Sequence, residues 1–286
     1  MRQSVKGRIF AGTMLALLLG LGLRANAADP GLKSASALVV DAGNGEVLYE
    51  RDASLVSPIA SITKLMTALV VLDGQQPLDE QIEITKADLW TGKGAFSRLA
   101  VGTKLTRGDL LKLALMASEN RAARTLGRNY PGGMPAFVRT MNEKAKSLGM
   151  TKTHFDDPSG LSNDNVSNAR DLAKLISAAS RDTRIREFST LRSHDVRLGK
   201  NMFTYRNTNL LIGRPDWDIL VQKTGFTNDA GECLVMQAKI GERPVNMVFL
   251  NSFGKLTRTA DARRVRKWIE AKHETTVAAV GEVASK

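Results

Sequence analysis

The spacing of apolar positions near the start of the chain predicts two strands followed by a buried helix. Residues 37–41 form a short apolar run and residues 46–50 alternate, with a Gly- and Asn-rich turn between them. This arrangement is typical of a β-hairpin. Residues 61–72 are apolar nearly all round, and that pattern predicts a helix buried on most of its sides.

The middle of the chain keeps a helical period. Thr106, followed by Asp109, and Asn168, followed by Asp171, have the character of residues that cap the start of a helix. Helices are therefore predicted after Thr106, at 121–129, at 134–149 and at 172–179. A Ser-, Asn- and Asp-rich loop with Pro and Gly separates the last two, over residues 155–168.

From about residue 194 the period changes again. Residues 218–225, 231–240 and 244–252 are predicted as three strands with Gly-bearing turns between them, and a basic helix follows at 262–271. Strands thus occur at both ends of the chain, with helices between them. We expect an α+β fold, in which one antiparallel sheet contains both terminal parts of the mature chain and helices pack on it.

The first residues have the order of a secretory signal peptide. Three basic residues precede an uncharged run at 9–23, which ends just before a small-x-small site at Ala25–Ala27. We expect residues 1–27 to be removed and the protein to be periplasmic; a retained N-terminal anchor is the alternative. No later stretch is apolar and long enough to span a membrane. The simplest division is then one domain over 28–271 and a tail over 272–286.

The composition narrows the classes of partner. The 286 residues include 41 Lys and Arg against 29 Asp and Glu, so the net charge is +12. Nucleic acid is disfavoured, because the chain has no zinc-finger spacing or aromatic RNA-binding motif and an exported protein rarely meets nucleic acid. Electrostatic association with anionic wall polymer or lipid head groups fits an exported protein better. Scattered, solvated charge is the alternative.

Cysteine and histidine usage argues against metal and disulfide chemistry. A single cysteine, Cys233, excludes a disulfide framework and a Cys-based zinc site, and it is expected to be a small core residue. The three histidines are far apart in the sequence, and none has the i, i+4 spacing of a metal pair. We expect no metal and no cofactor.

The start of the predicted helix at 61–72 carries the first candidate chemistry. Ser61 and Lys64 are three residues apart, so a helix places them on one face. Burial would lower the pKa of Lys64, and a neutral amine beside a hydroxyl is a general base beside a nucleophile. The pattern S-x-x-K occurs again at Ser252–Lys255, so it does not identify a site by itself. Ser61 as an ordinary helix-start serine is the alternative.

Two further short motifs are candidates. Ser118-Glu119-Asn120 follows a Leu-rich helix and would enter a cleft as a loop, although an ordinary helix break has the same pattern. Lys223-Thr224-Gly225 lies in an apolar strand. Its glycine would leave room for a ligand backbone, and its Lys and Thr side chains can bind a carboxylate. A strand that ends in a turn is the alternative for this motif.

The three motifs together resemble the signature S-x-x-K, S-x-N and K-T-G of the penicillin-recognising serine enzymes. Within them the chain resembles the low-molecular-mass penicillin-binding proteins of the D-alanyl-D-alanine endopeptidase type, over about residues 35–270. The stretches that carry the resemblance are SPIASITKLMTALVVLD, LLKLALMASENRAA, FDDPSGLSNDNVSNARDLAKL and VQKTGFTNDAGECLV. The resemblance implies binding of peptidoglycan peptides and covalent inhibition by β-lactams.

The resemblance also implies a role for each residue of the signature. Ser61 would be the nucleophile, Lys64 its base, and Ser118 a proton relay. The substrate would be bound by Asn120, Lys223, Thr224 and Gly225. The backbone N–H groups of Ser61 and Phe226 would form the oxyanion hole. His194 and Asp195 suggest a Ser-His-Asp triad, but no G-x-S-x-G turn accompanies them, so we interpret them as surface residues.

Several activities remain open within this resemblance. A class A β-lactamase would need a deacylating glutamate, and the region of His154–Asp157 has no E-x-x-L-N motif. A penicillin-binding sensor without turnover and a carboxypeptidase that trims pentapeptides are further alternatives. Only 61 residues follow Gly225, where many carboxypeptidases of the family carry a second domain and a membrane-binding helix. We therefore expect an endopeptidase without a membrane anchor.

Overall fold

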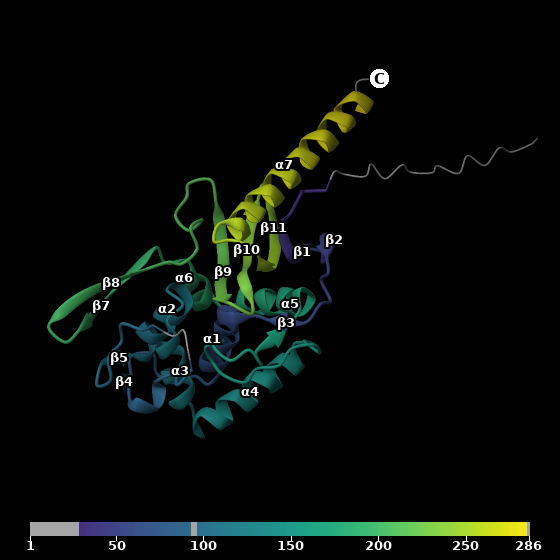
Figure 1. The fold of residues 1–286 in the computed structure, drawn as a ribbon. Helices are drawn as coiled ribbons and strands as arrows, with labels where there is room; N and C mark the ends of the chain where they lie inside the picture. Colours follow the sequence, from purple (N-terminus) through teal and green to yellow (C-terminus); the bar gives the residue numbers. More distant parts are fainter. Residues whose placement is uncertain (1–28, 93–95, 285–286) are drawn as a thin grey trace, which may run out of the picture.

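One five-stranded antiparallel sheet organises the molecule. The computed structural model describes residues 29–92 and 96–284 (Figure 1); the predicted signal peptide lies outside them. The strand order is β2-β1-β11-β10-β9. These strands are β1 (Ser34–Asp41), β2 (Val47–Arg51), β9 (Asp218–Thr227), β10 (Gly231–Ile240) and β11 (Arg243–Ser252). Because β1 pairs with β11 along its whole length, both terminal parts share one sheet, and the predicted α+β fold is confirmed.

The sheet is covered on both faces. Side chains alternate between faces along a strand, so neighbouring residues of β11 enter different core clusters. Met247 and Phe249 pack with Ala262 and Val265 of α7 (Thr257–Ala284). Val248 and Leu250 belong to the larger cluster with the other helices. Figure 1 shows α7 along one face of the sheet and the helical part of the chain on the other side.

Helix α1 (Lys64–Asp73) is the centre of the helical part. Every residue from Lys64 to Leu72 is buried, as the apolar pattern predicts, because α1 contacts all five other helices of this layer. These are α2 (Arg107–Met116), α3 (Asn120–Arg128), α4 (Gly133–Ser147), α5 (Ala169–Ala179) and α6 (Thr183–Thr190). The predicted caps are present, since Thr106 accepts a hydrogen bond from Asp109 N–H and Asn168 accepts one from Asp171 N–H.

Short elements connect these helices. Two-residue strands β3 (Ser57–Pro58) and β6 (Val166–Ser167) pair with each other, as do β4 (Gln81–Glu83) and β5 (Lys104–Thr106). A 3₁₀ turn, η1 (Ala60–Thr63), leads into α1, and a second, η2 (Lys86–Asp88), precedes α2.

The structure departs from the sequence prediction after residue 180. The sequence pattern did not predict α6 or the hairpin of β7 (Ser193–Leu198) and β8 (Asn201–Arg206). Most side chains of the hairpin are exposed, so its apolar pattern is weak, and Figure 1 shows it projecting away from the sheet. Helix α7 begins five residues earlier than predicted and continues through the expected tail to Ala284. The division of the chain at residue 271 stays a prediction.

Candidate active site

The S-x-x-K motif spans the junction between η1 and α1. Ser61 lies in η1, and Lys64 is the first residue of α1. The sequence pattern predicted Ser61 in the first α-helical turn; it lies in the 3₁₀ turn just before it. The i, i+3 spacing still directs both side chains to one side, with Lys64 Nζ 2.6 Å from Ser61 Oγ.

Lys64 is fully buried and has three polar partners. Nζ contacts Ser61 Oγ, Asn120 Oδ1 at 2.7 Å and the carbonyl oxygen of Ser159 at 2.6 Å. A neutral amine has two N–H donors and one lone pair. Its donors match Asn120 Oδ1 and the Ser159 carbonyl, which can only accept. The lone pair is then directed to the one partner that can donate, the hydroxyl of Ser61.

Burial lowers the pKa of Lys64 to about 7, and the charges of Asp157 and Glu119 partly oppose this by raising it. Close to half of the molecules therefore carry the neutral amine at neutral pH. Burial also lowers the pKa of Lys223, well below its ordinary value, with smaller contributions from Lys64 and Arg258. Burial, and not the charge of Lys223, lowers the pKa of Lys64.

Ser118 reaches the site from the loop between α2 and α3. Lys223 Nζ on β9 donates to Ser118 Oγ at 2.9 Å and to the carbonyl oxygen of Thr224 at 2.7 Å. Ser118 holds a left-handed backbone with φ of 58°, and Ala60, beside Ser61, has φ of 46°. Such conformations are strained in residues other than glycine and are enriched at active sites.

Gly225 is needed for the close approach of β9 to η1. A Cβ atom on Gly225 would lie 2.9 Å from the carbonyl oxygen of Ile59 and 3.2 Å from the backbone nitrogen of Ser61. The space beside this glycine is thus occupied by the protein's own backbone, whereas the sequence pattern predicted that a ligand backbone would occupy it. The close contact brings Phe226 to the same side of the molecule as Ser61. Both residues line a hollow of about 380 Å³, together with Asn120.

The loop at 157–165 supplies site residues that the motif analysis missed. The carboxylate of Asp157 accepts hydrogen bonds from the backbone N–H groups of Ser159, Gly160 and Ser162. This network fixes the Ser159 carbonyl that binds Lys64. Gly160 has φ of 78°, and a Cβ there would come within 1.9 Å of the Ala60 carbonyl oxygen. The sequence signal was the segment D-P-S-G, an ordinary turn sequence.

Thr208 is another site residue that the sequence did not indicate. Its Oγ1 lies 2.6 Å from Oγ1 of Thr224, and its backbone N–H donates to the carbonyl oxygen of Met116. Thr208 therefore connects β9 with the end of α2 at the place where the K-T-G and S-x-N motifs meet. It lies in a short polar segment after the unpredicted hairpin, where no periodic signal exists.

Arg258 of α7 binds the backbone of β9, the strand that carries the K-T-G motif, and of the neighbouring β10. Its Nη1 donates to the carbonyl oxygens of Gly225 at 2.6 Å and Cys233 at 3.0 Å, and it pairs with Glu232. Cys233 is completely buried, as predicted, and burial raises the pKa of its thiol to about 11. The thiol is therefore not set up to react.

The histidine beside Asp195 does not join Ser61. His194 Nε2 lies 2.8 Å from Oδ1 of Asp109 on α2, and Asp195 accepts from Thr204 on the neighbouring strand. His194 is partly buried instead of fully at the surface. The interpretation that this pair is no catalytic triad agrees with these contacts, since both partners are used elsewhere.

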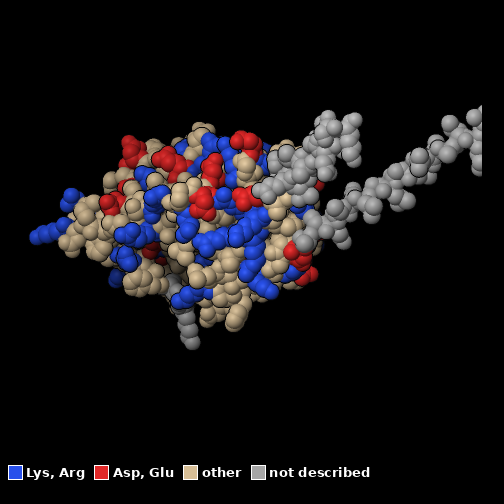
Figure 2. All heavy atoms as spheres, turned by 90° about the horizontal axis from the view of Figure 1, so that it is seen from above, with Lys and Arg blue, Asp and Glu red and all other residues tan. Residues whose placement is uncertain are grey.

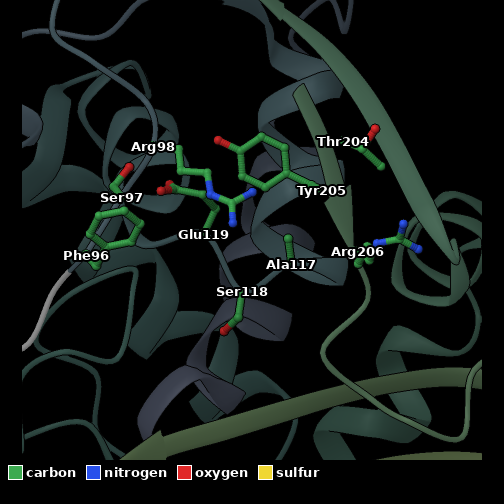
Figure 3. Close-up of a pocket in the computed structure, with 9 residues that line it drawn as sticks. All are labelled: Phe96, Ser97, Arg98, Ala117, Ser118, Glu119, Thr204, Tyr205 and Arg206. Carbon is green, nitrogen blue, oxygen red and sulfur yellow. The ribbon is translucent and has the colours of Figure 1, made fainter. Parts of the chain in front are cut away.

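A second hollow, of about 370 Å³, has Ser118 in its wall (Figure 3). It is bounded by the 96–98 segment, by the loop at Ala117–Glu119 and by residues Thr204–Arg206 of β8. Ser118 lines this hollow, and Ser61 lines the first one. The serines of the Ser61–Lys64 and Ser118–Lys223 pairs thus line different hollows.

Comparison with known proteins places the chain in a family. A family model described as D-alanyl-D-alanine carboxypeptidase matches residues 24–254. A D-alanyl-D-alanine endopeptidase of Pseudomonas aeruginosa is 50% identical over 253 residues, which cover 88% of this chain and 82% of that protein. One from Escherichia coli is 48% identical over 246 residues, covering 85% of this chain and 79% of its own.

Solved structures agree with this assignment. The crystal structure of a Streptomyces DD-transpeptidase superposes with a TM-score of 0.80 at 28% identity, covering 85% of this chain and 99% of that one. A penicillin-binding protein from Listeria monocytogenes, solved in a cefotaxime-bound form, gives a TM-score of 0.74 at 31% identity, covering 83% and 97% of the two chains. The chain belongs to the D-alanyl-D-alanine carboxypeptidase family of serine peptidases.

Within residues 29–92 and 96–284, none of the helices has both the length and the apolar character needed to cross a bilayer.

Proposed function

We propose that this protein is a serine-type D-alanyl-D-alanine endopeptidase that hydrolyses D-alanyl bonds in peptidoglycan cross-links through an acyl-enzyme at Ser61. The observation that carries the proposal is the contact of 2.6 Å between Ser61 Oγ and a buried Lys64 whose pKa is about 7. A serine hydroxyl is a weak nucleophile unless a base beside it can take its proton. Lys64 is such a base at neutral pH.

In the acylation step, Ser61 Oγ attacks the carbonyl carbon of the D-alanyl residue while its proton passes to Lys64 Nζ. Asn120 Oδ1 and the Ser159 carbonyl then bind the ammonium that forms, so its charge is stabilised without rearrangement. The oxyanion is bound by the backbone N–H groups of Ser61 and Phe226. Their placement on one hollow supports this role, and each such donor contributes about 3 kcal/mol to the transition state.

The leaving amine needs a proton when the C–N bond breaks. Ser118 relays it, donating its hydroxyl proton to the nitrogen and recovering one from Lys64. Lys223 holds Ser118 in place through its contact of 2.9 Å. Lys223 and Thr224 bind the carboxylate next to the scissile bond, and Asn120 binds the amide of the acyl half. Water then attacks the acyl-enzyme, with Lys64 again as the base. A β-lactam acylates the same serine, because its strained amide resembles the D-Ala-D-Ala bond.

The relatives at 50% and 48% identity are named endopeptidases, and this supports cross-link cleavage over trimming of free stem peptides. The test is to digest purified cross-linked muropeptide dimers and free pentapeptides side by side. We expect the dimers to fall to monomers. Release of D-alanine from pentapeptides, with the dimers left intact, would make the protein a carboxypeptidase instead.

The place of action that we propose is the periplasm, with electrostatic association to anionic wall polymer or lipid head groups. Figure 2 shows Lys and Arg side chains gathered over the middle of one face, with many of the acidic side chains toward its upper edge. Arg263 and Lys267 of α7 are exposed and can contribute to this association. Release of the protein from isolated wall by salt is the expected result.

A further inference from the structure

The second hollow is lined by Ser118 and not by the nucleophile, whereas the first hollow is lined by Ser61 and not by Ser118. In the proposed reaction the scissile bond lies between Ser61, which attacks the carbonyl carbon, and Ser118, which serves the leaving nitrogen. The acyl half of the substrate then occupies the hollow lined by Ser61 and Asn120. The leaving half extends past Ser118, into the hollow whose wall includes Glu119 and Tyr205.

The size of the second hollow exceeds what a carboxypeptidase needs there. A carboxypeptidase releases one small amino acid, whereas cleavage of a cross-link releases an amine that carries a whole peptide. The volume of about 370 Å³ is in the range of sites that hold extended small ligands. The hairpin β7–β8 builds one wall with Thr204, Tyr205 and Arg206, and Figure 1 shows this hairpin projecting beyond the body of the fold.

Two buried oxygen atoms in the wall of this hollow have no hydrogen-bond partner within the described residues. Tyr205 is 6% exposed, yet its hydroxyl makes no hydrogen bond to the part of the chain that the structure describes. Glu119 is also 6% exposed, and its Oε1 has no partner at hydrogen-bond distance among these residues. Burial raises the pKa of its carboxyl group, and the nearby Ser97 hydroxyl partly opposes this by lowering it. Its Oε2 accepts from Ala122 N–H. Buried polar atoms are rarely left without a partner, so both can bind a ligand group: the Glu119 oxygen can accept from a donor, and the Tyr205 hydroxyl can donate or accept.

Two arginines add positive charge to the same hollow. Arg98 lies over the ring of Tyr205 at 5.8 Å, and Arg206 is at the exposed rim. Among residues 29–92 and 96–284, neither guanidinium has a carboxylate partner. Figure 3 shows the side chains of Arg98, Glu119 and Tyr205 converging, with Arg206 on the far side of Tyr205. Guanidinium groups favour carboxylates, whereas the two unpaired acceptors favour N–H donors.

We propose that this hollow is the subsite for the leaving peptide of the cross-link, an anionic peptide whose carboxylate binds Arg98 and Arg206 and whose amide N–H groups bind Glu119 and Tyr205. The inference rests on the proposed endopeptidase function and names the part of the site that selects a cross-link over a free stem peptide. Binding energy spent on the remote part of a substrate can raise the rate at the reacting bond. Arg98 and Arg206 are then specificity residues that act on one substrate class more than on another.

The test compares two substrates on the same enzyme. The ratio of kcat/KM for muropeptide dimers to kcat/KM for free pentapeptides is measured for the wild type, Arg98→Gln and Arg206→Gln. We expect Arg98→Gln to lower this ratio about tenfold, which corresponds to the loss of one charge-assisted hydrogen bond. Arg206→Gln should lower it by a similar factor, because Arg98 and Arg206 are both exposed. Arg98→Lys should restore part of the ratio, since it keeps the charge.

Arg197→Gln is the matched control. Arg197 is an exposed arginine on the same hairpin, on strand β7, and it does not line the hollow. It should keep the wild-type ratio. The fraction of each preparation that penicillin acylates, read from intact-protein mass, reports the share of folded enzyme. If Arg98→Gln does not fold, Arg206→Gln and Tyr205→Phe decide the question.

Two outcomes would overturn the inference, and they are distinguishable. If the wild type cleaves dimers and both arginine variants keep its substrate ratio, the subsite is wrong and the endopeptidase function stands. If the wild type trims pentapeptides and leaves dimers intact, the endopeptidase function fails, together with the subsite that rests on it.

Discussion

The chain contains the tetrapeptide pattern S-x-x-K twice, and the two copies have different surroundings. In the first, Ser61 and Lys64 span the start of a buried helix, and their polar atoms are 2.6 Å apart. In the second, Ser252 ends strand β11, and Lys255 lies in an exposed, non-helical connection. Ser252 Oγ is 2.7 Å from Ser34 Oγ. The Ser34 hydroxyl in turn donates to Asp261.

The difference shows what the pattern needs before it can do chemistry. A helical turn places the two side chains together, and burial then lowers the pKa of the lysine. At Ser61 both conditions hold. At Ser252 neither holds, and the hydroxyl serves instead to connect the sheet to α7 through Asp261. The same four-residue pattern thus places a buried amine against a hydroxyl in one copy and has only structural contacts in the other, depending on the element that contains it.

The largest effect is expected from removing the two serines in turn. Ser61→Ala should abolish the covalent penicillin adduct, because it removes the hydroxyl that Lys64 activates in the proposed reaction, and intact-protein mass spectrometry measures this directly. Ser252→Ala should keep the adduct and cost about 1 kcal/mol of unfolding free energy for one lost hydrogen bond. An adduct that survives in Ser61→Ala, or that maps to Ser252, would reverse the assignment.

The lysines of the two copies, Lys64 and Lys255, should also differ in their effect on acylation. Lys64→Arg should slow acylation by about 10²–10⁴-fold, the usual contribution of a general base, because arginine does not give up its proton. Stopped-flow measurement of the acylation rate constant gives the comparison. Lys255→Arg is the control and should acylate at the wild-type rate. Equal rates for the two variants would remove Lys64 from the role of base.

The pH dependence of acylation tests whether burial lowers the pKa of Lys64, the second condition in the comparison. Lys64 must be neutral to take the proton of Ser61, and its pKa is about 7. The acylation rate constant should therefore rise about tenfold per pH unit below pH 7 and level off above it. A profile that is flat from pH 5 to pH 9 would contradict this, and so would one that rises only near pH 10, where a solvated lysine titrates.

The smallest effect is expected from breaking two pairs of hydrogen-bonded hydroxyl groups. One pair is Thr208 with Thr224 of the K-T-G motif, and the other is Ser34 with Ser252 of the second S-x-x-K copy. Thr208→Val removes the partner of the Thr224 hydroxyl and should lower kcat/KM for peptide substrates about three- to tenfold, the effect of one hydrogen bond. Thr208→Ser keeps the hydroxyl and should retain most of the activity. Ser34→Ala breaks the corresponding pair with Ser252 and should change the thermal midpoint but not kcat/KM. A loss of activity in Ser34→Ala would contradict the structural role given to that pair.

Much of the fold could be predicted, because the strands and helices that form the core have strong local patterns. Strand β10 has the predicted limits, and the caps at Thr106 and Asn168 are in place. Helix α6 and the β7–β8 hairpin were missed, since their side chains are largely polar or exposed and carry little period. The extension of α7 beyond residue 271 was also missed.

The predicted site residues come from three distant segments, and their order along the chain was enough to associate them. What the motifs did not contain was the set of supporting groups. The Ser159 carbonyl, held by Asp157, binds Lys64, and Thr208 binds Thr224. A backbone carbonyl has no sequence signature, and a threonine in a polar loop looks like any other. These contacts form between segments 16 to 95 residues apart.

The sequence by itself determined the elements and the residue types at the site, because helical spacing and strand alternation depend on near neighbours along the chain. It also determined that Ser61 and Lys64 would face each other if a helix formed there. The tertiary structure alone decided which of the two S-x-x-K copies is buried and how far the pKa of Lys64 falls. It also decided which carbonyl oxygens accept hydrogen bonds from Lys64. Burial and desolvation are set by segments that fold over the site from elsewhere in the chain, so no local pattern contains them.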